Sequence, residues 1–426
     1  MERIVIIADD LTGACDTGIQ FRKYGWETNV FVTPASCRTL AEAGSPVISL
    51  NTDTRSVSAD AAYEAVSSAL KSLKDREDTF FYKKVDSVLR GNISSELEAC
   101  FQTLGFEFAL IAPAFPEASR CVRGGRLYIG SGEAMQDLGD ARMRVSAGSR
   151  RGCELLPLET VRSGTSAVIR RLEALTEQGA TLILADCCSS EDLSTIAEAA
   201  LHFGRRCISV GSAGLAGRLA ELFGKNPKQK ELHSGCRTVQ DGALMVVVGT
   251  RHPATVAQVQ RLKAEEPMDT YLLTVEGISQ ENVPQRVDTL IGERQSPGRA
   301  KGILVTTDLI YDGKDVCRHL LQHNAYNRSI LDGIGMSVKK LMERGRVRGL
   351  IVSGGDVASE ILCRLHFDRI SLMDEPIPGI VIGEAMGENI SPVLLATKSG
   401  GFGDENALLM LYRYMNGLDV LKGAME

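Results

Sequence analysis

The sequence predicts an α/β protein of two domains, each with a largely parallel sheet, and a cleft between the domains. Three observations lead to this prediction. The chain has 426 residues, 44% of them hydrophobic, which is more than one ordinary hydrophobic core holds. Short aliphatic runs alternate with amphipathic stretches, as in βα units with right-handed crossovers. The 42 glycines suit turns that bring the backbone close to ligands.

The first domain is expected to cover residues 1–228. Its strands should be short, rich in β-forming residues and bounded by turn residues. They are predicted at Ile4–Ala8, Pro46–Leu50, Thr79–Lys83 and Phe108–Ala112. Helices are predicted over Ala59–Leu73, with Ser58 as the N-cap, and over Ser95–Thr103. The stretch Gly130–Gly152 has the least regular pattern, and we interpret it as a loop or excursion of this domain.

A polar, charged segment without apolar periodicity, Gly224–Gly242, is predicted to link the two domains. The second domain is expected to cover residues 240–426. Its strands are predicted at Ala243–Val248, Gly302–Thr306, Gly349–Val352 and Val393–Thr397. Helices are expected to begin at Val357 and to cover Glu405–Tyr414, each soon after a glycine-rich turn.

Composition and charge argue against several classes of protein. The net charge is −6 and no basic stripe runs along a helix, so we expect no nucleic-acid partner. The N-terminus lacks a signal-peptide pattern, and no run approaches the roughly 20 apolar residues that span a bilayer. We therefore predict a cytoplasmic protein without a membrane partner. The 11 cysteines are interpreted as reduced thiols. The sequence leaves a homodimer open.

Charged residues follow the predicted strands of the first domain. The carboxyl ends of parallel strands meet at one edge of a sheet, where ligands bind. The candidate substrate-binding residues at this edge are Asp9, Asp10, Arg55, Lys83, Lys84, Asp86, Ser87 and Arg90. Guanidinium groups bind carboxylates and carboxylates bind hydroxyls, so the mixture favours a polyhydroxy acid. A simpler explanation stays open, in which Asp9–Asp10 only caps a helix and Lys83–Lys84 forms a solvated turn.

Glycine-rich turns follow three predicted strands of the second domain. They are Gly249–Pro253, Ser353–Asp356 and Lys398–Asp404. Backbone N–H groups at such turns bind phosphate, and a helix N-terminus adds positive charge. Together the turns indicate a polyphosphate site, although ordinary turns that need a positive φ remain an alternative. Gly211–Gly217 has the wrong spacing for a dinucleotide site, and we expect it to serve close packing of a helix on a strand.

Together these motifs resemble the four-carbon acid sugar kinase family over most of the chain. The resemblance is carried by ADDLTGA (8–14), NTDTR (51–55), YKKVDSVLRGNI (82–93), APAFPEASR (112–120), VGSAGLA (210–216), VSGGD (352–356) and KSGGFGD (398–404). It implies that the first domain binds a sugar acid and the second binds ATP with Mg²⁺. It further implies phosphorylation of the terminal hydroxyl of threonate, erythronate or 3-oxo-tetronate. The stretch from Lys83 to Asn92 is more similar to the threonate and erythronate kinases.

The resemblance also implies roles for particular residues. Its acid-binding motifs match Asp10, Arg55, Arg90 and the stretch Lys84–Ser87. Its nucleotide motifs match His252, Gly354, Gly355, Asp356, Val357, Gly400, Gly401 and Gly403. We hypothesise that Asp86 or Asp10 orients the attacking hydroxyl and that Lys84 offsets charge on the transferring phosphoryl group. Arg55 and Arg90 would hold the substrate carboxylate, and Asp356 would be a ligand of Mg²⁺.

Two other functions stay open at this point. A haloacid-dehalogenase-like phosphatase is suggested by Asp9-Asp10-Leu11-Thr12, although its DxDxT spacing requires an acid where Leu11 stands. A non-enzymatic sugar-acid-binding module would have two similar lobes. The chain departs from the family pattern at His252-Pro253, where relatives tend to have Ser-Pro, and over Gly124–Arg151. Because that stretch should line the substrate pocket, the particular acid is left open.

Overall fold

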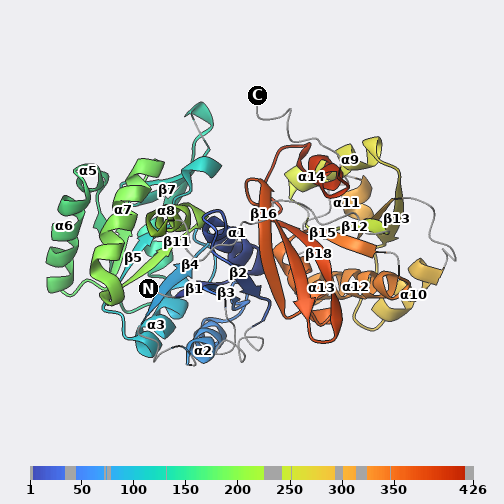
Figure 1. Ribbon diagram of the computed structural model, residues 1–426, viewed down its shortest axis with the longest axis horizontal. Helices are drawn as coiled ribbons and strands as arrows, with labels where there is room; N and C mark the ends of the chain where they lie inside the picture. The colour runs from blue at the N-terminus through green and yellow to red at the C-terminus, as the bar shows by residue number, and fades with distance from the viewer. Residues whose placement is uncertain are drawn as a thin grey trace. The chain divides into compact units, whose positions relative to one another are not determined.

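The computed structural model describes residues 3–33, 45–71, 73, 78–130, 132–224, 242–250, 252–292, 301–312, 324–345 and 347–417. The chain divides into two units, Met1–Leu232 and His233–Glu426, which Figure 1 shows in blue to green and in yellow to red. The predicted linker Gly224–Gly242 lies outside the described residues except for its two end glycines. No helix in the described part of the chain is long and apolar enough to cross a membrane.

The main sheet of the first unit is parallel and has the strand order β2-β3-β1-β4-β11-β5-β10-β9. The strands are β1 Arg3–Ala8, β2 Thr28–Phe31, β3 Val47–Asn51, β4 Thr79–Lys84, β5 Phe108–Ala112, β9 Cys153–Leu156, β10 Leu182–Ala185 and β11 Cys207–Gly211. Ala8 pairs with both Asn51 and Lys84, so β1, β3 and β4 end side by side. The four strands predicted in this unit are confirmed, whereas β2, β9, β10 and β11 were not predicted.

Helices cover both faces of this sheet (Figure 1). Ile4 and Ile6 of β1 belong to one core, whose helices are α1 Leu11–Arg22, α6 Thr165–Glu177, α7 Ser190–Phe203 and α8 Ala213–Phe223. Val5 and Ile7 belong to the other core, whose helices are α2 Ala59–Leu70 and α3 Ile93–Leu104. Both faces are therefore buried, which explains why the strands read as continuous hydrophobic runs. Ser58 caps α2 as predicted, since its side chain accepts a hydrogen bond from the Ala61 amide.

The stretch Gly130–Gly152 contains a strand and a helix, so of the two interpretations it is an excursion of the first unit and not an irregular loop. An antiparallel sheet forms from β6 Arg120–Arg123, β7 Arg126–Ile129 and β8 Gln136–Asp140, and it is followed by α4 Ala141–Val145 and later by α5 Leu158–Arg162. The carboxylate of Asp186 accepts hydrogen bonds from the amides of Gly124 and Gly125, both at 2.9 Å. These bonds hold the turn between β6 and β7. Short polar strands such as β8 carry no hydrophobic alternation, so sequence periodicity misses them.

The sheet of the second unit has the strand order β13-β14-β12-β15-β18-β17-β16. Its strands are β12 Ala243–Val248, β13 Met268–Leu273, β14 Gly302–Thr307, β15 Val347–Ser353, β16 Arg369–Ile377, β17 Ile380–Gly387 and β18 Ile390–Lys398. The pairs β16–β17 and β17–β18 are antiparallel and the remaining pairs from β13 to β18 are parallel, so the prediction of a largely parallel sheet is confirmed. Strand β13 and the hairpin of β16 and β17 were not predicted.

The helices of the second unit also lie on two faces of its sheet (Figure 1). They are α9 Pro253–Glu265, α10 Val283–Gly292, α11 Asp308–Asp312, α12 Asn324–Glu343, α13 Gly355–Arg364 and α14 Ala407–Met415. Val246 shares a core with Val259 of α9, Ile310 of α11 and Leu408 of α14, while α12 packs against α10 and α13. The helices expected from Val357 and over Glu405–Tyr414 are confirmed with small shifts of their bounds.

The glycines of Gly211–Gly217 let α8 pack closely, as the sequence predicts. A side chain at Gly211 would place its Cβ 2.6 Å from the carbonyl oxygen of Ala112 and 2.8 Å from the Tyr82 hydroxyl. That hydroxyl donates a hydrogen bond to the carbonyl of Ser212 at 2.5 Å. The close approach joins β4, β11 and the start of α8, and it leaves no room for a methyl group.

We predict that Gly211→Ala destabilises the first unit by about 1–3 kcal/mol, because overpacking forces the backbone of β5 or the Tyr82 ring to move. Gly217→Ala is the matched control, since its Cβ would meet only the Gln20 side chain at 3.7 Å, and alanine favours a helix by roughly 0.5–1 kcal/mol over glycine. Urea unfolding followed by circular dichroism measures both. Equal midpoints for the two variants would contradict the packing account.

Candidate functional site

Arg55 joins the two acidic residues that follow β1. Its Nε and Nη2 donate to the two carboxylate oxygens of Asp9 at 2.7 and 2.8 Å, and Nη2 also donates to Asp10 Oδ1 at 2.7 Å. Asp9 is 2% exposed, and this guanidinium together with the charge of Lys83 compensates its carboxylate. Burial opposes the charge of Arg55, but Asp9 and Asp10 outweigh it and raise its pKa. The interaction places the loop after β3 against the end of β1.

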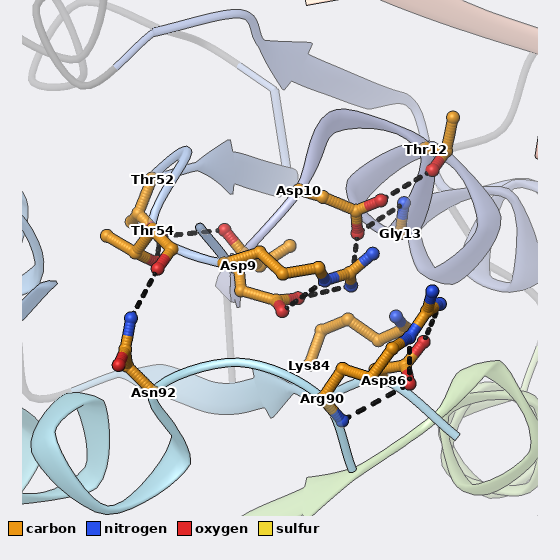
Figure 2. A network of polar contacts seen from close by, with 12 residues as sticks. Asp9, Asp10, Thr12, Gly13, Thr52, Thr54, Lys84, Asp86, Arg90 and Asn92 are labelled. Carbon is orange, nitrogen blue, oxygen red and sulfur yellow. Dashed lines mark hydrogen bonds and ion pairs between the residues drawn. The ribbon is translucent and has the colours of Figure 1, made fainter. Parts of the chain in front are cut away.

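Asp10 also begins helix α1. Its Oδ1 accepts from the Gly13 amide at 3.1 Å and its Oδ2 from the Thr12 hydroxyl at 2.6 Å, as Figure 2 shows. The capping explanation is therefore correct for Asp10, although the same carboxylate pairs with Arg55. Burial disfavours the ionised carboxylate, yet the charges of Arg55 and Lys84 outweigh burial and lower its pKa. Asp10 thus stays ionised at neutral pH.

Asp86 follows β4 and is held in the same manner by Arg90. Asp86 Oδ2 accepts from Arg90 Nε at 2.9 Å and Oδ1 from Arg90 Nη2 at 2.7 Å. The amides of Val88 and Arg90 also donate to Oδ2. Burial raises the pKa of this carboxyl, but the bonds to Arg90 and the charges of Arg55 and Lys84 lower it well below its usual range. Ser87 is half-buried on the turn between the two residues.

Lys83 lies beneath this edge in an ion pair that sequence reasoning missed. Its Nζ is 2.8 Å from Glu96 Oε2, and the two side chains are 0% and 1% exposed. The same Nζ donates to the carbonyls of Ile7 at 3.2 Å and Lys84 at 2.8 Å. Glu96 also accepts from the Thr54 hydroxyl at 2.5 Å. The solvated-turn explanation for Lys83–Lys84 is wrong, because both lysines are buried.

Lys84 differs from its neighbour because no described residue accepts a hydrogen bond from its ammonium. The side chain is 5% exposed and reaches toward α1, where a Cβ on Gly13 would lie 2.6 Å from Nζ. Figure 2 shows Lys84 between the Asp10 and Asp86 ends of the cluster. Its charge contributes to the lowered pKa of both carboxyls, but it forms a close pair with neither. Lys84 is therefore a buried cation available to an anionic ligand.

The edge holds both acidic and basic side chains. The acids are Asp9, Asp10, Asp86 and Glu96, and the bases are Arg55, Arg90, Lys83 and Lys84. Arg120 of β6 was not among the predicted site residues. Burial is the largest cause of the lowered pKa of Arg120. The charge of Asp86 raises this pKa and the charge of Arg90 lowers it. The motif APAFPEASR ends at this arginine and was the signal that could have found it.

In the second unit, the three glycine-rich turns come together around Thr250, at the carboxyl ends of β12, β15 and β18. A Cβ on Gly400 would lie 2.6 Å from the Thr250 hydroxyl, and one on Gly354 would lie 3.6 Å from Thr250 Cβ. The amide of Gly354 donates to the Lys398 carbonyl at 2.9 Å. Gly354 and Gly403 have φ of 117° and 79°, a region that favours glycine.

The residues expected to bind nucleotide lie in or beside these turns. His252 caps α9 by accepting from the Ala254 amide at 3.3 Å, and its Nε2 would be 3.4 Å from a Cβ on Gly401. Gly355 opens α13, and Asp356 is exposed in the first turn. Val357 is buried against Gly249, so its side chain serves packing. The described residues contain no group of three or more His, Cys, Asp or Glu side chains placed to hold a metal.

Two family models match the chain. Residues 4–219 match a sugar-binding N-terminal domain, and residues 245–408 match a nucleotide-binding C-terminal domain. The first range contains the charged edge, and the second contains the three glycine-rich turns.

Curated proteins similar to the chain are named kinases. A D-erythronate kinase of Heliobacterium modesticaldum is 27% identical, with 97% of each chain covered. A D-threonate kinase of Salmonella typhimurium is 26% identical over 95% of this chain and 96% of its own. A 3-oxo-tetronate kinase of Methylobacterium radiotolerans is 29% identical over 93% and 95%.

Solved structures share the fold. A Salmonella typhimurium protein superposes with a TM-score of 0.73 at 22% identity, covering 96% of this chain and 98% of its own. A Haemophilus influenzae protein has a TM-score of 0.65 at 23% identity, covering 97% and 99%. At such identities these structures support the fold alone.

We predict unequal effects on stability for the two adjacent lysines. Lys83→Met should destabilise the first unit by about 3–5 kcal/mol, because it leaves the buried Glu96 without its counter-charge. Lys84→Met should change stability much less, because the cost of burying an ammonium without a close partner offsets its attraction to Asp10 and Asp86. Urea unfolding of the two variants and the parent measures this difference. A loss of stability in Lys84→Met as large as that in Lys83→Met would contradict the account.

Proposed function

This chain belongs to the four-carbon acid sugar kinase family, and on that premise we propose that it phosphorylates the terminal hydroxyl of D-threonate or D-erythronate. ATP is the donor, and the product is the 4-phosphate. The observation that carries the proposal is Lys84, a buried ammonium without a described partner at a sheet edge lined with carboxylates. In the proposed division of labour, the first unit binds the acid and the second binds ATP.

The guanidinium N–H groups that form no ion pair with described residues are suited to bind a sugar acid. Arg55 and Arg90 use Nε and Nη2 on their aspartates, and neither Nη1 donates to any group in the described chain. Arg90 is the more accessible, with 62% of its side chain exposed against 21% for Arg55. We assign the substrate carboxylate to these two guanidinium groups, Arg90 making the closer contact, and the hydroxyls to acceptor oxygens of Asp10 and Asp86.

Phosphoryl transfer requires mostly positioning and charge compensation. In this proposal Asp86 or Asp10 accepts a hydrogen bond from the terminal hydroxyl and orients its oxygen for attack. The lowered pKa of both carboxyls keeps them ionised and suits orientation better than early removal of a proton. Lys84 then offsets the negative charge on the phosphoryl group during transfer.

The three glycine-rich turns of the second unit are the proposed ATP site. Amides of Gly355, Gly400, Gly401 and Gly403 would donate to phosphate oxygens, with His252 beside them. Gly354, whose own amide donates to the Lys398 carbonyl, would shape the turn. Asp356 fits a role as a Mg²⁺ ligand, because Mg²⁺ is commonly held by one or two carboxylates together with substrate phosphates. Bound Mg²⁺ would supply charge neutralisation on those phosphates.

The phosphatase alternative has less support. It needs an aspartate nucleophile followed two residues later by a second acid, and Leu11 and Thr12 stand at those places after Asp9 and Asp10. Phosphatase activity without ATP would revive it. The homodimer that the sequence leaves open is tested separately by the mass of the protein in solution.

We expect ADP release when the protein is incubated with ATP and either D-threonate or D-erythronate. A coupled assay across both enantiomers of each acid and 3-oxo-tetronate identifies the substrate. The relatives include kinases of all three acids, so the comparison is informative. Activity restricted to 3-oxo-tetronate would correct the proposed substrate, and no activity with any of these acids would contradict the proposal.

Lys84→Met should lower kcat by about 100-fold or more while the KM for ATP changes little, because transition-state charge loses its buried cation. The unfolding measurement described above establishes that the variant is folded. A large rise in the KM for the acid with kcat retained would instead assign Lys84 to the substrate carboxylate. Unchanged kinetics would remove Lys84 from the site.

A further inference from the structure

The turn that follows β18 has its carbonyl oxygens directed at buried side chains. Lys398 Nζ donates to the carbonyls of Ser399 at 2.9 Å and Gly400 at 3.5 Å. The hydroxyl of Thr255, on α9, donates to the Gly400 carbonyl at 2.8 Å and accepts from Lys398 Nζ at 3.3 Å. Lys398 and Thr255 are both 0% exposed, so these bonds lie beneath the turn.

Gln258 extends this set of bonds along the turn. It lies three residues after Thr255 on α9, on the same face of the helix, and is also 0% exposed. Its Nε2 donates to the carbonyls of Phe402 and Gly403, each at 3.2 Å, and of Asp404 at 2.6 Å. Buried donors therefore meet nearly every carbonyl between Ser399 and Asp404.

The direction of these carbonyls determines the direction of the amides that follow them. In a planar trans peptide, the carbonyl of one residue and the N–H of the next point to opposite sides. With the carbonyls of Ser399, Gly400 and Phe402 held inward, the N–H groups of Gly400, Gly401 and Gly403 point outward. None of these three amides donates to a group within the described residues. Successive free amides of this kind form an anion-binding concavity.

We infer that Lys398, Thr255 and Gln258 are positioning residues that direct the amides of Gly400, Gly401 and Gly403 at the phosphates of ATP. The inference rests on the proposed function, since it assumes that ATP binds at this turn. The three side chains act through the backbone from beneath the turn, without touching the nucleotide.

The charge of Lys398 is the reason to assign more than a structural role to this set. Neutral donors such as Thr255 and Gln258 are sufficient to satisfy buried carbonyls. An ammonium buried without a counter-charge is costly, and Lys398 forms no ion pair in the part of the chain that the structure describes. Burial accordingly lowers the pKa of Lys398 to about 8. A phosphate group on the other side of the turn would provide the missing negative charge.

The test compares substitutions beneath the turn with a matched control on the same helix. We expect Lys398→Met and Thr255→Val to raise the KM for ATP about tenfold or more, with the KM for the acid unchanged. Thr255→Ser keeps the hydroxyl and should restore near-parent values. The control is Lys263→Met on α9, because Lys263 Nζ donates to the Tyr311 carbonyl at 2.7 Å, away from the turn, and should not change either KM.

Calorimetry with ADP separates this inference from the proposed function. If the parent protein binds no ADP, the nucleotide site and the inference both fail. If the parent binds ADP and the Lys398 and Thr255 variants bind it equally well, the inference alone fails. Equal changes in both KM values would indicate a general loss of structure and would also overturn it. Should Lys398→Met not fold, the comparison of Thr255→Val with Thr255→Ser carries the same test.

Discussion

The pairing of Arg55 with Asp9 and Asp10 is the interaction on which the charged edge of the first unit depends. Parallel strands bring their carboxyl ends together, and burying carboxylates there is costly unless each has a counter-charge. Arg55 joins the loop after β3 to the end of β1, Lys83 compensates Glu96, and Arg90 compensates Asp86. Once these pairs have formed, Lys84 is the buried cation left without a close partner. The ion pairs within the protein therefore determine which charged groups remain for a substrate to bind.

We propose that the second unit binds an anion through oriented backbone amides. The buried donors Lys398, Thr255 and Gln258 hold carbonyl oxygens of the turn after β18 inward, so that amides face outward. Fixed dipoles of this kind need not reorganise when charge develops nearby, which is why they are effective in phosphoryl transfer. Side-chain charge in one unit and backbone dipoles in the other are two physical solutions to the problem of holding negatively charged groups.

Much of the fold follows from the sequence, because strands buried on both faces, such as β1 and β12, appear as aliphatic runs. The strands that the sequence did not predict include two kinds. Polar strands such as β8 have no hydrophobic pattern, and β10 and β11 resemble the apolar parts of helices. At the site, position after a strand identified Asp10, Arg55 and Lys84. It could not separate Lys83 from Lys84, because only the packing of Glu96 beneath the sheet distinguishes a compensated lysine from an available one. Lys398 was not identified for a similar reason, since its burial and its contact with Thr255 of α9 depend on packing between distant parts of the sequence.

The most direct test of the account is the identity of the product. Phosphorus-31 nuclear magnetic resonance, correlated with the proton spectrum, can follow the parent protein mixed with ATP, Mg²⁺ and D-erythronate or D-threonate. The account predicts ADP together with one new phosphomonoester whose phosphorus couples to the two protons of the terminal carbon. Inorganic phosphate as the only new signal, or a phosphate on an internal carbon, would contradict it.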